Sequence, residues 1–416
     1  MKLTIDRLGH LGDGIAQGPE GAVFVPGMLP GEEIEGDLQG SALQNVRIIT
    51  PSASRIRPPC SHARTCGGCM MQHASDALVA EWKLGIVQGA LSGQGLAAHF
   101  RPIVTSPPRS RRRATLSARR TKSGVLLGFH ARASDMVVAV PNCQLLHPKL
   151  IATFPALEAL AKIAGSRSTE LAMTVTASLA GPDVVIRGGK PLDSELQLDL
   201  ARLAETHGIA RLTWDNETIA LRTQPMQRFG RALVAPPPGA FLQATAEGET
   251  ALLRSVVLAV GSARKITDLF AGVGTFSLPL AERAEVHAAE SLPAMLAALE
   301  KGARGAEGLR RVTTETRDLF RRPKARITQR HCLPPVNSYT RSPIGANPPQ
   351  SLPSLLGTSQ IQFPSNTSLA LTFYAPVVHF TCANTVLATA ITKVNGSLTP
   401  DLSKILATSL PQFGPN

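Results

Sequence analysis

The chain has 416 residues, which is long enough for two or three domains with their own apolar cores. Its 43 lysines and arginines outnumber 30 aspartates and glutamates, and this excess of +13 favours a polyanionic partner, because basic side chains displace counterions from phosphates. The first residues hold no apolar signal-peptide core, and the longest uncharged stretch, 368–391, contains His, Asn and Thr, which argues against a membrane span. We therefore expect a cytoplasmic protein, in which clustered cysteines indicate metal binding or catalysis rather than disulfides.

Residues 1–52 alternate short apolar runs with glycine and proline turns, as in GAVFVPGMLPGEEIEGDL. Short strands with this punctuation predict a small β-barrel. Residues 53–230 begin with a basic, proline-bearing connector and then mix helical with alternating patterns, which predicts an α+β domain. Its expected helices are 77–91, 150–164 and 195–207, and its expected strands are 114–120, 124–130, 173–180, 182–189 and 209–215.

The start of this second region is strongly basic. Such a run can be a solvated face, but its closeness to a cysteine cluster favours RNA binding. The residues concerned are Arg109, Arg111, Arg112, Arg113, Arg119, Arg120, Lys122 and Arg132.

From residue 231 to 322 the pattern becomes helix, strand, glycine loop, helix, strand, helix. The predicted strands are 265–270 and 285–290, and the glycine loop at 271–276 is expected to open a helix that runs to 284. This order is typical of the first half of a doubly wound, Rossmann-like α/β domain.

The loop sequence Asp268-Leu-Phe-Ala-Gly-Val-Gly-Thr275 follows the first of these strands. Its glycines, Gly272 and Gly274, let the backbone approach a ligand closely. Glu290 ends the next strand, where a carboxylate can accept hydrogen bonds from both hydroxyls of a ribose. The loop lacks a third phosphate-facing glycine, which favours S-adenosylmethionine over a dinucleotide. A purely structural strand-to-helix turn is the alternative.

A second constellation consists of four cysteines, Cys60, Cys66, Cys69 and the distant Cys143. Thiolates at this spacing can surround one metal centre, because CxxC places two sulfurs on adjacent corners of a tetrahedron. Zinc and a [4Fe–4S] cluster both accept four cysteines, and the spacing alone does not decide between them.

Through these motifs the chain resembles the bacterial RNA uracil-C5-methyltransferases, and among them the type that forms 5-methyluridine in 23S ribosomal RNA. The similarity covers residues 1–322. It implies a TRAM-like, OB-like barrel at 1–52 (GDGIA, VFVPGMLPGE), a central iron–sulfur and RNA-binding domain at 53–230, and the N-terminal half of a class I methyltransferase domain at 231–322. It also implies RNA as the partner, S-adenosylmethionine as the cofactor, and a monomer.

The resemblance further implies roles for individual residues. The four cysteines match the family's [4Fe–4S] ligands, which by analogy decides against zinc. The cofactor contacts that it implies, beside Gly272 and Gly274, are Gln243 in PPPGAFLQ, Phe270 and Thr275 in DLFAGVGTF, Glu290 on the ribose, and Asp318 in RDLF near the adenine.

The composition changes at residue 323. Residues 323–416 hold a single acidic residue, Asp401, and six lysines or arginines, together with both tyrosines and 12 of the 32 prolines. Amphipathic helices of the length that a methyltransferase domain needs are missing from this tail. We therefore predict an aberrant tail, frameshifted or poorly ordered.

The family motifs expected beyond residue 322 are Asp-Pro-Pro-Arg, a nucleophilic cysteine in Ser-Cys-Asn-Pro, and a glutamate base, and no glutamate follows Glu315. Partial echoes are Asn347-Pro-Pro-Gln350 and Thr381-Cys382-Ala-Asn384, so Cys382 is the candidate nucleophile. One codon choice for Thr340–Ile344, read one nucleotide later, gives Leu-Asp-Pro-Pro. Our hypothesis is a reading-frame shift near Pro323, which the gene's nucleotide sequence would test.

Two alternatives to methylation of uracil carbon 5 are open. A non-catalytic RNA-binding iron–sulfur protein would keep the barrel, the cysteines and the basic run without chemistry. An amino-group methyltransferase would use Asn347-Pro-Pro-Gln350 and need no cysteine nucleophile.

Overall fold

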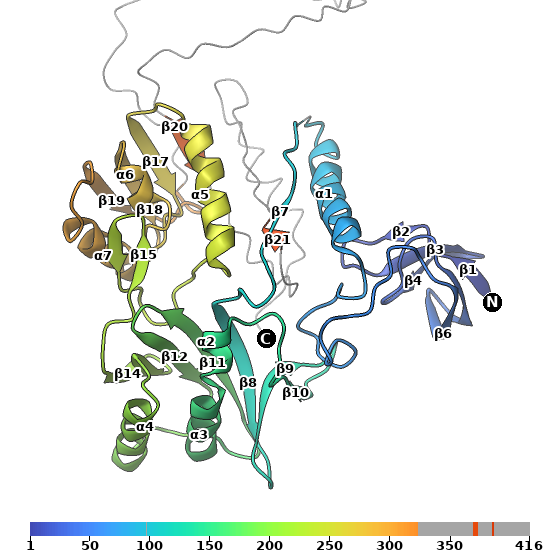
Figure 1. Ribbon diagram of the computed structural model, residues 1–416, viewed down its shortest axis with the longest axis horizontal. Coiled ribbons are helices and arrows are strands. Elements are labelled where there is room, and N and C mark those ends of the chain that lie inside the picture. The colour runs from blue at the N-terminus through green and yellow to red at the C-terminus, as the bar shows by residue number, and fades with distance from the viewer. Residues whose placement is uncertain (97, 323–368, 373–384, 387–416) are drawn as a thin grey trace, which may run out of the picture. The chain divides into compact units, whose positions relative to one another are not determined.

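The computed structural model describes residues 1–96, 98–322, 369–372 and 385–386 (Figure 1). The described residues form two compact units. The first contains residues 1–228, 233–259 and 385–386, and the second contains 229–232, 260–322 and 369–372. The predicted tail at 323–416, with Cys382 and Asn347–Gln350, lies outside the described residues except for two short strands at 369–372 and 385–386. No helix in the described ranges is long and apolar enough to cross a bilayer.

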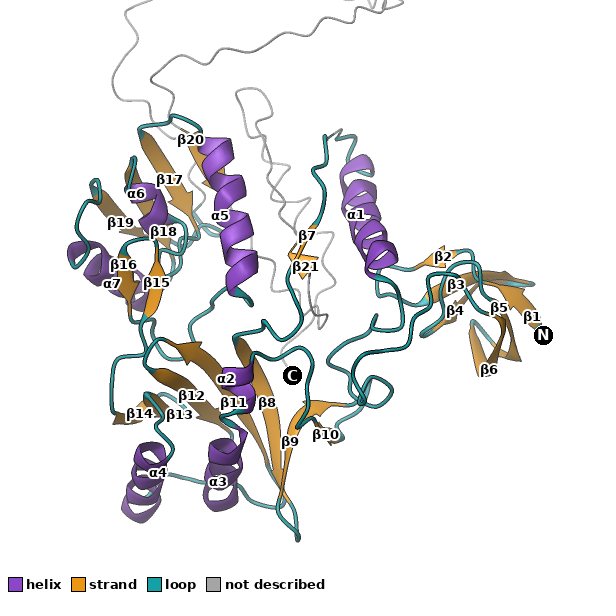
Figure 2. Cartoon of the chain, viewed as in Figure 1, coloured by secondary structure: helices purple, strands orange, loops and turns teal. Residues whose placement is uncertain are grey.

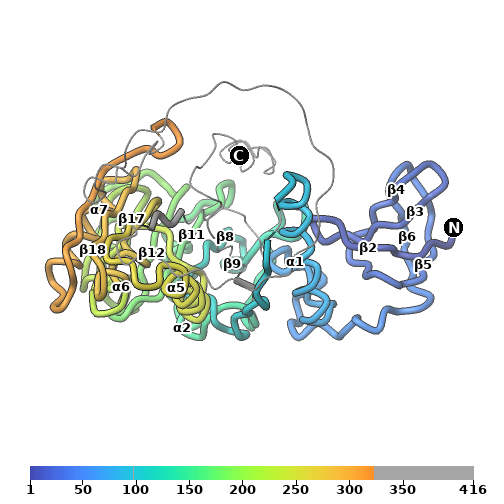
Figure 3. Tube along the Cα trace, turned by 90° about the horizontal axis from the view of Figure 1, so that it is seen from above, coloured from blue at the N-terminus to red at the C-terminus, as the bar shows by residue number. Residues whose placement is uncertain are grey.

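The first fifty residues fold into a curled six-stranded sheet (Figure 3). Its edge strands, β1 and β2, are separated in sequence only by Ile5 and Asp6. Ile5 N–H donates to Glu32 O at 2.9 Å and Asp6 N–H donates to Ile15 O at 2.8 Å, so this short link connects the two ends of the sheet. The strand order is β1-β5-β6-β4-β3-β2, with β1 (Lys2–Thr4), β2 (Arg7–Leu8), β3 (Gly14–Gly18), β4 (Gly21–Val25), β5 (Glu33–Gln39) and β6 (Ala42–Thr50).

The cysteine segment leads into helix α1 (Asp76–Ser92), which confirms the helix predicted there. Ser75 caps the helix by accepting a hydrogen bond from the N–H of Leu78 at 3.3 Å. Trp82 of α1 donates from Nε1 to Gly9 O at 2.9 Å, so the helix is tied to a turn of the N-terminal sheet.

The centre of the first unit is a seven-stranded sheet (Figure 2). All neighbouring strands are antiparallel except β12 and β13, which are parallel. Along β8 the residues Ala114, Leu116 and Ala118 are buried, and the residues between them turn to the other face, as the alternating pattern predicts. The order is β10 (Val137–Ala139), β9 (Val125–His130), β8 (Arg113–Arg120), β11 (Glu170–Ser178), β12 (Gly181–Arg187), β13 (Arg211–Trp214) and β14 (Glu217–Leu221).

Helices α3 (Phe154–Ala164) and α4 (Ser194–Thr206) cover the buried face of this sheet. Leu157 and Leu160 of α3 are fully buried in the same core as Leu116. The helix predicted at 150–164 is wrong in one respect, because it is interrupted after α2 (Pro148–Ile151). Pro155 explains the break: it lacks an N–H and starts a new helix instead of continuing one.

The sheet of the second unit contains only parallel strands, in the order β19-β18-β17-β20. A parallel sheet with intervening helices is the α/β architecture that the sequence predicts. Strands β19 and β20 were not predicted. The elements are β17 (Lys265–Leu269), α6 (Ser277–Ala281), β18 (Glu285–Glu290), α7 (Pro293–Arg304), β19 (Val312–Thr316) and β20 (Leu369–Thr372).

The remaining elements are short, apart from α5 (Ala246–Val260), most of which belongs to the first unit and not to the predicted methyltransferase domain. The others are β15 (Gln227–Phe229), which pairs with β16 (Ala232–Val234), and β7 (Val104–Thr105), which pairs with β21 (Thr385–Val386).

Candidate functional site

The glycine loop of the second unit leaves β17 at a buried carboxyl group. Asp268 is 3% exposed, and its Oδ2 accepts a hydrogen bond from Ser277 Oγ at 2.6 Å. Burial raises the pKa of Asp268 to about 6, the hydrogen bond from Ser277 opposes this, and the nearby charge of Glu290 adds to the rise. Ser277 was not identified from the sequence, because nothing in its pattern marks it as the partner of Asp268.

The two glycines of the loop have different structural reasons for being glycine. Both have positive φ, 56° at Gly272 and 88° at Gly274. A Cβ at Gly274 would lie 2.8 Å from Leu299 Cγ and 3.0 Å from Leu278 Cδ1, so this position is required for packing. A Cβ at Gly272 would meet nothing within 4 Å. Gly272 therefore faces open space.

Glu290 ends β18 and holds the loop in place. Its Oε2 accepts the N–H of Gly272 at 3.1 Å, and its Oε1 accepts three donors: the N–H and the hydroxyl of Ser291 and the N–H of Leu292. The hydrogen-bonding capacity of Oε1 is thus used by the turn at Ser291 and Leu292. Oε2 keeps a second lone pair, so one strong bond to a ribose hydroxyl is available instead of the symmetrical pair expected from the sequence.

The other predicted cofactor residues of this unit lie near the same loop. Phe270 has a positive φ of 62°, and its ring lies 5.4 Å from that of Phe320, tilted by 54°. Asp318 Oδ1 accepts the N–H groups of Phe320 and Arg321 at 3.0 and 3.1 Å, which fixes the turn that carries Phe320. The two aromatic rings provide apolar faces of the kind that bind an adenine. Thr275 is half-buried.

The helix that follows the glycine loop is shorter than the sequence predicts. The helix expected from the loop to residue 284 is only five residues long, Ser277–Ala281, and Phe276 provides no side-chain cap. Such a helix has too few aligned peptide dipoles to serve as an anion site, so the loop itself is the candidate binding element. Gln243 belongs to the first unit, so its predicted contact with the cofactor stays a prediction.

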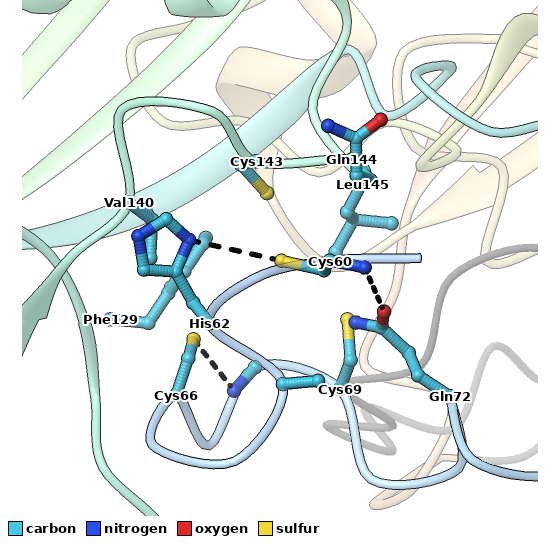
Figure 4. Close-up of a pocket in the computed structure, with 12 residues that line it drawn as sticks. Cys60, His62, Cys66, Cys69, Gln72, Phe129, Val140, Cys143, Gln144 and Leu145 are labelled. Carbon is cyan, nitrogen blue, oxygen red and sulfur yellow. Dashed lines mark hydrogen bonds between the residues drawn. The ribbon is translucent and has the colours of Figure 1, made fainter. Parts of the chain in front are cut away.

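The four predicted metal ligands come together in the first unit. Cys60, Cys66, Cys69 and Cys143 line one small cavity of about 20 Å³, and Figure 4 shows their sulfur atoms facing a common space. None of them forms a disulfide. Cys143 reaches this cavity from a turn after β10, which explains its distance in sequence from the other three.

Two of the four thiols are shifted toward their neutral form by burial. Burial raises the pKa of Cys66 and of Cys143, and Cys60 adds to both rises. Arg111 is close enough to lower the pKa of Cys143. His62 Nδ1 lies 3.9 Å from Cys60 Sγ. Within the described ranges, no three His, Cys, Asp or Glu side chains are grouped as a single metal ion requires.

The basic run is partly a buried structure rather than a solvated face. Burial lowers the pKa of Arg111 and of Arg113. Arg113 donates from a terminal nitrogen to Gly239 O at 3.1 Å, while its Nε has no hydrogen-bond partner among the residues described. Arg112 pairs with Glu249 at 2.5 Å, with side chains 14% and 15% exposed. Sequence alone lists these arginines as a run and does not separate them.

No protein-family model matches the chain. It is 38% identical over 322 residues to an uncharacterized RNA methyltransferase of Brucella suis, covering 77% of this chain and 78% of that protein. It is 33% identical over 347 residues to the 23S rRNA (uracil(1939)-C(5))-methyltransferase RlmD of Shewanella sp. strain ANA-3, covering 77% and 76%.

A solved structure is similar in fold. It is the Pyrococcus abyssi tRNA (uracil-54, C5)-methyltransferase in complex with S-adenosyl-L-homocysteine, with a TM-score of 0.56, 18% identity, and coverage of 76% of this chain and 79% of that one. The sequence similarity, spread over more than two thirds of each protein, is sufficient to assign the family. The chain belongs to the RNA methyltransferases, in the family that includes the 23S ribosomal RNA uracil-C5-methyltransferases.

Proposed function

We propose that this chain transfers a methyl group from S-adenosylmethionine to carbon 5 of a uridine in 23S ribosomal RNA, as a cytoplasmic monomer. The observation that carries the proposal is the loop between β17 and α6, in a chain 33% identical to a named 23S uracil-C5-methyltransferase. There Gly272 faces open space and Glu290 keeps an acceptor beside it.

The residues of the second unit fit the cofactor. Glu290 Oε2 would accept a ribose hydroxyl, the backbone at Gly272 would approach the cofactor closely, and Phe270 and Asp318 would border the adenine. Thr275 and Gln243 complete the proposed set. S-adenosylmethionine supplies an electrophilic methyl group, and these residues orient it.

Uracil imposes a further requirement. Carbon 5 is a poor nucleophile until a thiolate adds to carbon 6, and a base must later remove the carbon-5 proton so that the thiolate can leave. The candidate thiol, Cys382, lies outside the described residues, and the sequence has no glutamate after Glu315. We therefore expect the chain with this tail to bind cofactor and RNA but to form little 5-methyluridine.

Incubation of the purified chain with labelled S-adenosylmethionine and unmodified 23S ribosomal RNA tests this expectation. Formation of 5-methyluridine at many turnovers would contradict the expected low activity. RNA binding with no transfer, even after the tail is replaced by that of a relative, would support the non-catalytic alternative instead.

Binding of S-adenosylhomocysteine tests the cofactor site independently of turnover. Glu290→Gln replaces one acceptor oxygen by an amide NH2 group, which would face N–H and O–H donors. We expect about tenfold or greater loss of S-adenosylhomocysteine affinity, measured by calorimetry. Glu285→Gln, on an exposed residue of the same strand, is the matched control. Equal affinities of the two variants would remove Glu290 from the site.

We also propose that the cysteine cavity holds a [4Fe–4S] cluster. The support is that all four cysteines line this one cavity and that the family resemblance matches them to the ligands of such a cluster. The cysteines would bind one iron each, and the cluster, when bound, contributes a net negative centre near Arg111.

Iron, sulfide and zinc assays on anaerobically purified protein test the metal proposal. We expect iron and sulfide near stoichiometry for one cluster, lost in Cys143→Ser and retained in Cys332→Ser. Zinc without sulfide in the wild-type chain would overturn it.

A further inference from the structure

The segment just before β8, residues 110–112, forms hydrogen bonds along both of its edges. Successive residues of an extended chain turn their backbone groups to opposite sides. Arg111 faces the loop that follows Cys143, and Arg112 faces the segment that contains Gln243. All three pieces of chain belong to the first unit.

The Cys143 loop fixes the first edge. Arg111 N–H donates to Leu145 O at 3.1 Å, and His147 N–H donates to Arg111 O at 2.9 Å. These bonds give Arg112 a fixed backbone from which its side chain extends.

Arg112 holds the second edge with its backbone and its side chain. Its N–H donates to Ala244 O at 2.8 Å, and its Nε donates to Gln243 O at 3.1 Å. Ser106 Oγ lies 2.6 Å from Thr245 Oγ1 and strengthens the same junction. The carbonyl groups of both Gln243 and Ala244 therefore accept hydrogen bonds from Arg112.

The guanidinium of Arg112 also reaches helix α5. A terminal nitrogen donates to Glu249 Oε2 at 2.5 Å, and both side chains are largely buried. Burial raises the pKa of Glu249 and the charge of Arg112 opposes that rise, so the guanidinium favours the ionised carboxylate. A planar fork can fix a carbonyl and a carboxylate relative to one another, whereas the point charge of a lysine cannot.

We propose that Arg112 is a positioning residue, which holds the main chain of Gln243 and Ala244 against the start of α5 and so fixes the backbone on which any cofactor contact of Gln243 depends. This rests on the cofactor contact proposed for Gln243. Among the described residues, Arg112 donates hydrogen bonds to Gln243, Ala244 and Glu249.

Arg112→Lys tests the proposal, because it keeps the charge opposite Glu249 but loses the Nε–H bond to Gln243 O. Arg55→Lys is the matched control, because Arg55 binds a buried carboxylate and a backbone carbonyl in the same way but in the N-terminal sheet. Its guanidinium donates to Glu32 at 2.5 Å and to Gly27 O at 2.8 Å. The measurements are S-adenosylhomocysteine affinity, the unfolding temperature, and hydrogen exchange of the Gly248 and Glu249 amides, which donate to Thr245.

We expect Arg112→Lys to weaken S-adenosylhomocysteine binding about tenfold and to accelerate exchange at both amides. Arg55→Lys should lower the unfolding temperature at least as much and leave affinity and exchange unchanged. Full rescue by lysine, or an equal loss of affinity in Arg55→Lys, would overturn the proposal. If the wild-type chain does not bind S-adenosylhomocysteine, the proposed function fails instead, and the exchange measurement still reports whether Arg112 holds the segment.

Discussion

Two carboxyl groups of the second unit, Asp268 and Glu290, are buried in different chemical settings. Glu290 accepts four hydrogen bonds, from Gly272, Ser291 and Leu292. Asp268 accepts a hydrogen bond from the hydroxyl of Ser277, and burial raises its pKa to about 6. Two acidic residues near the ends of adjacent parallel strands are therefore bonded in different ways.

Asp268 makes the stability of the chain depend on pH. Its folded pKa of about 6 lies above the unfolded value of 3.8, so its favourable contribution is complete below pH 3.8 and is lost as pH rises through 6. We expect the free energy of unfolding of the wild type, relative to that of Asp268→Asn, to fall by about 2 kcal/mol between pH 4 and pH 7.5. Urea unfolding of both proteins across this range measures the difference. A difference that stays constant or rises with pH would contradict the raised pKa.

At the scale of elements, the glycine loop combines a packing position with an open one. Gly274→Ala would place a methyl group 2.8 Å from Leu299 in a backbone conformation that alanine rarely adopts. We expect it to destabilise the second unit by about 2 kcal/mol or more, measured by thermal or urea unfolding.

Gly272→Ala provides the comparison. It carries similar backbone strain but no clash, so its loss of folding free energy should be about 1 kcal/mol. Its loss of binding free energy for S-adenosylhomocysteine should be larger than this loss of folding free energy. If Gly272→Ala were the more destabilising of the two, the assignment of packing to Gly274 would be wrong.

Element types followed well from periodicity, and their ends did not. Alternation identified β8 and β9, and the sequence also predicted β11, β12 and β13, whose buried residues share one core with α3 and α4. The break between α2 and α3 depends on a single proline, Pro155, within an otherwise helical pattern. The early end of α6 at Ala281 has no such marker in the sequence. Strand β19 escaped prediction since none of its residues is fully buried, which leaves its apolar pattern weak.

At the scale of the whole molecule, the candidate site was predictable where residues are adjacent in sequence. The glycine loop and its acid follow from one strand–loop–helix pattern. The burial of Arg111, Arg112 and Arg113 does not, because their partners at residues 143–147 and 239–249 are remote in the chain. The four cysteines were matched by family resemblance, and in the structure they line one cavity.

The tail carries a prediction about the gene. The match to the Brucella suis relative runs over 322 residues, or 77% of the chain, and 322 residues also precede the change in composition. We expect another reading frame downstream of codon 323 to encode Asp-Pro-Pro-Arg and Ser-Cys-Asn-Pro. Sequencing the nucleotides checks this directly, and the absence of both motifs from the other two frames would refute the frameshift.

The net charge of +13 carries a prediction about RNA. If the excess cations neutralise phosphates, affinity for ribosomal RNA should fall about tenfold or more between 50 and 200 mM salt, because counterion release drives the association. Filter binding over this range measures the slope. A nearly flat dependence would show that the charge serves solubility instead.

The segment bonded on both edges also bears on how the protein folds during synthesis. Its first edge can pair once residue 147 has left the ribosome, but the hydrogen bond from Arg112 to Gln243 spans 131 residues and must wait for the remainder. At the usual pace of translation this delay lasts roughly 5 to 20 s. During that interval the backbone at Arg112 has one unpaired edge, and the guanidinium of Arg112 has no carboxylate partner. A chaperone or another nascent chain could pair with that edge.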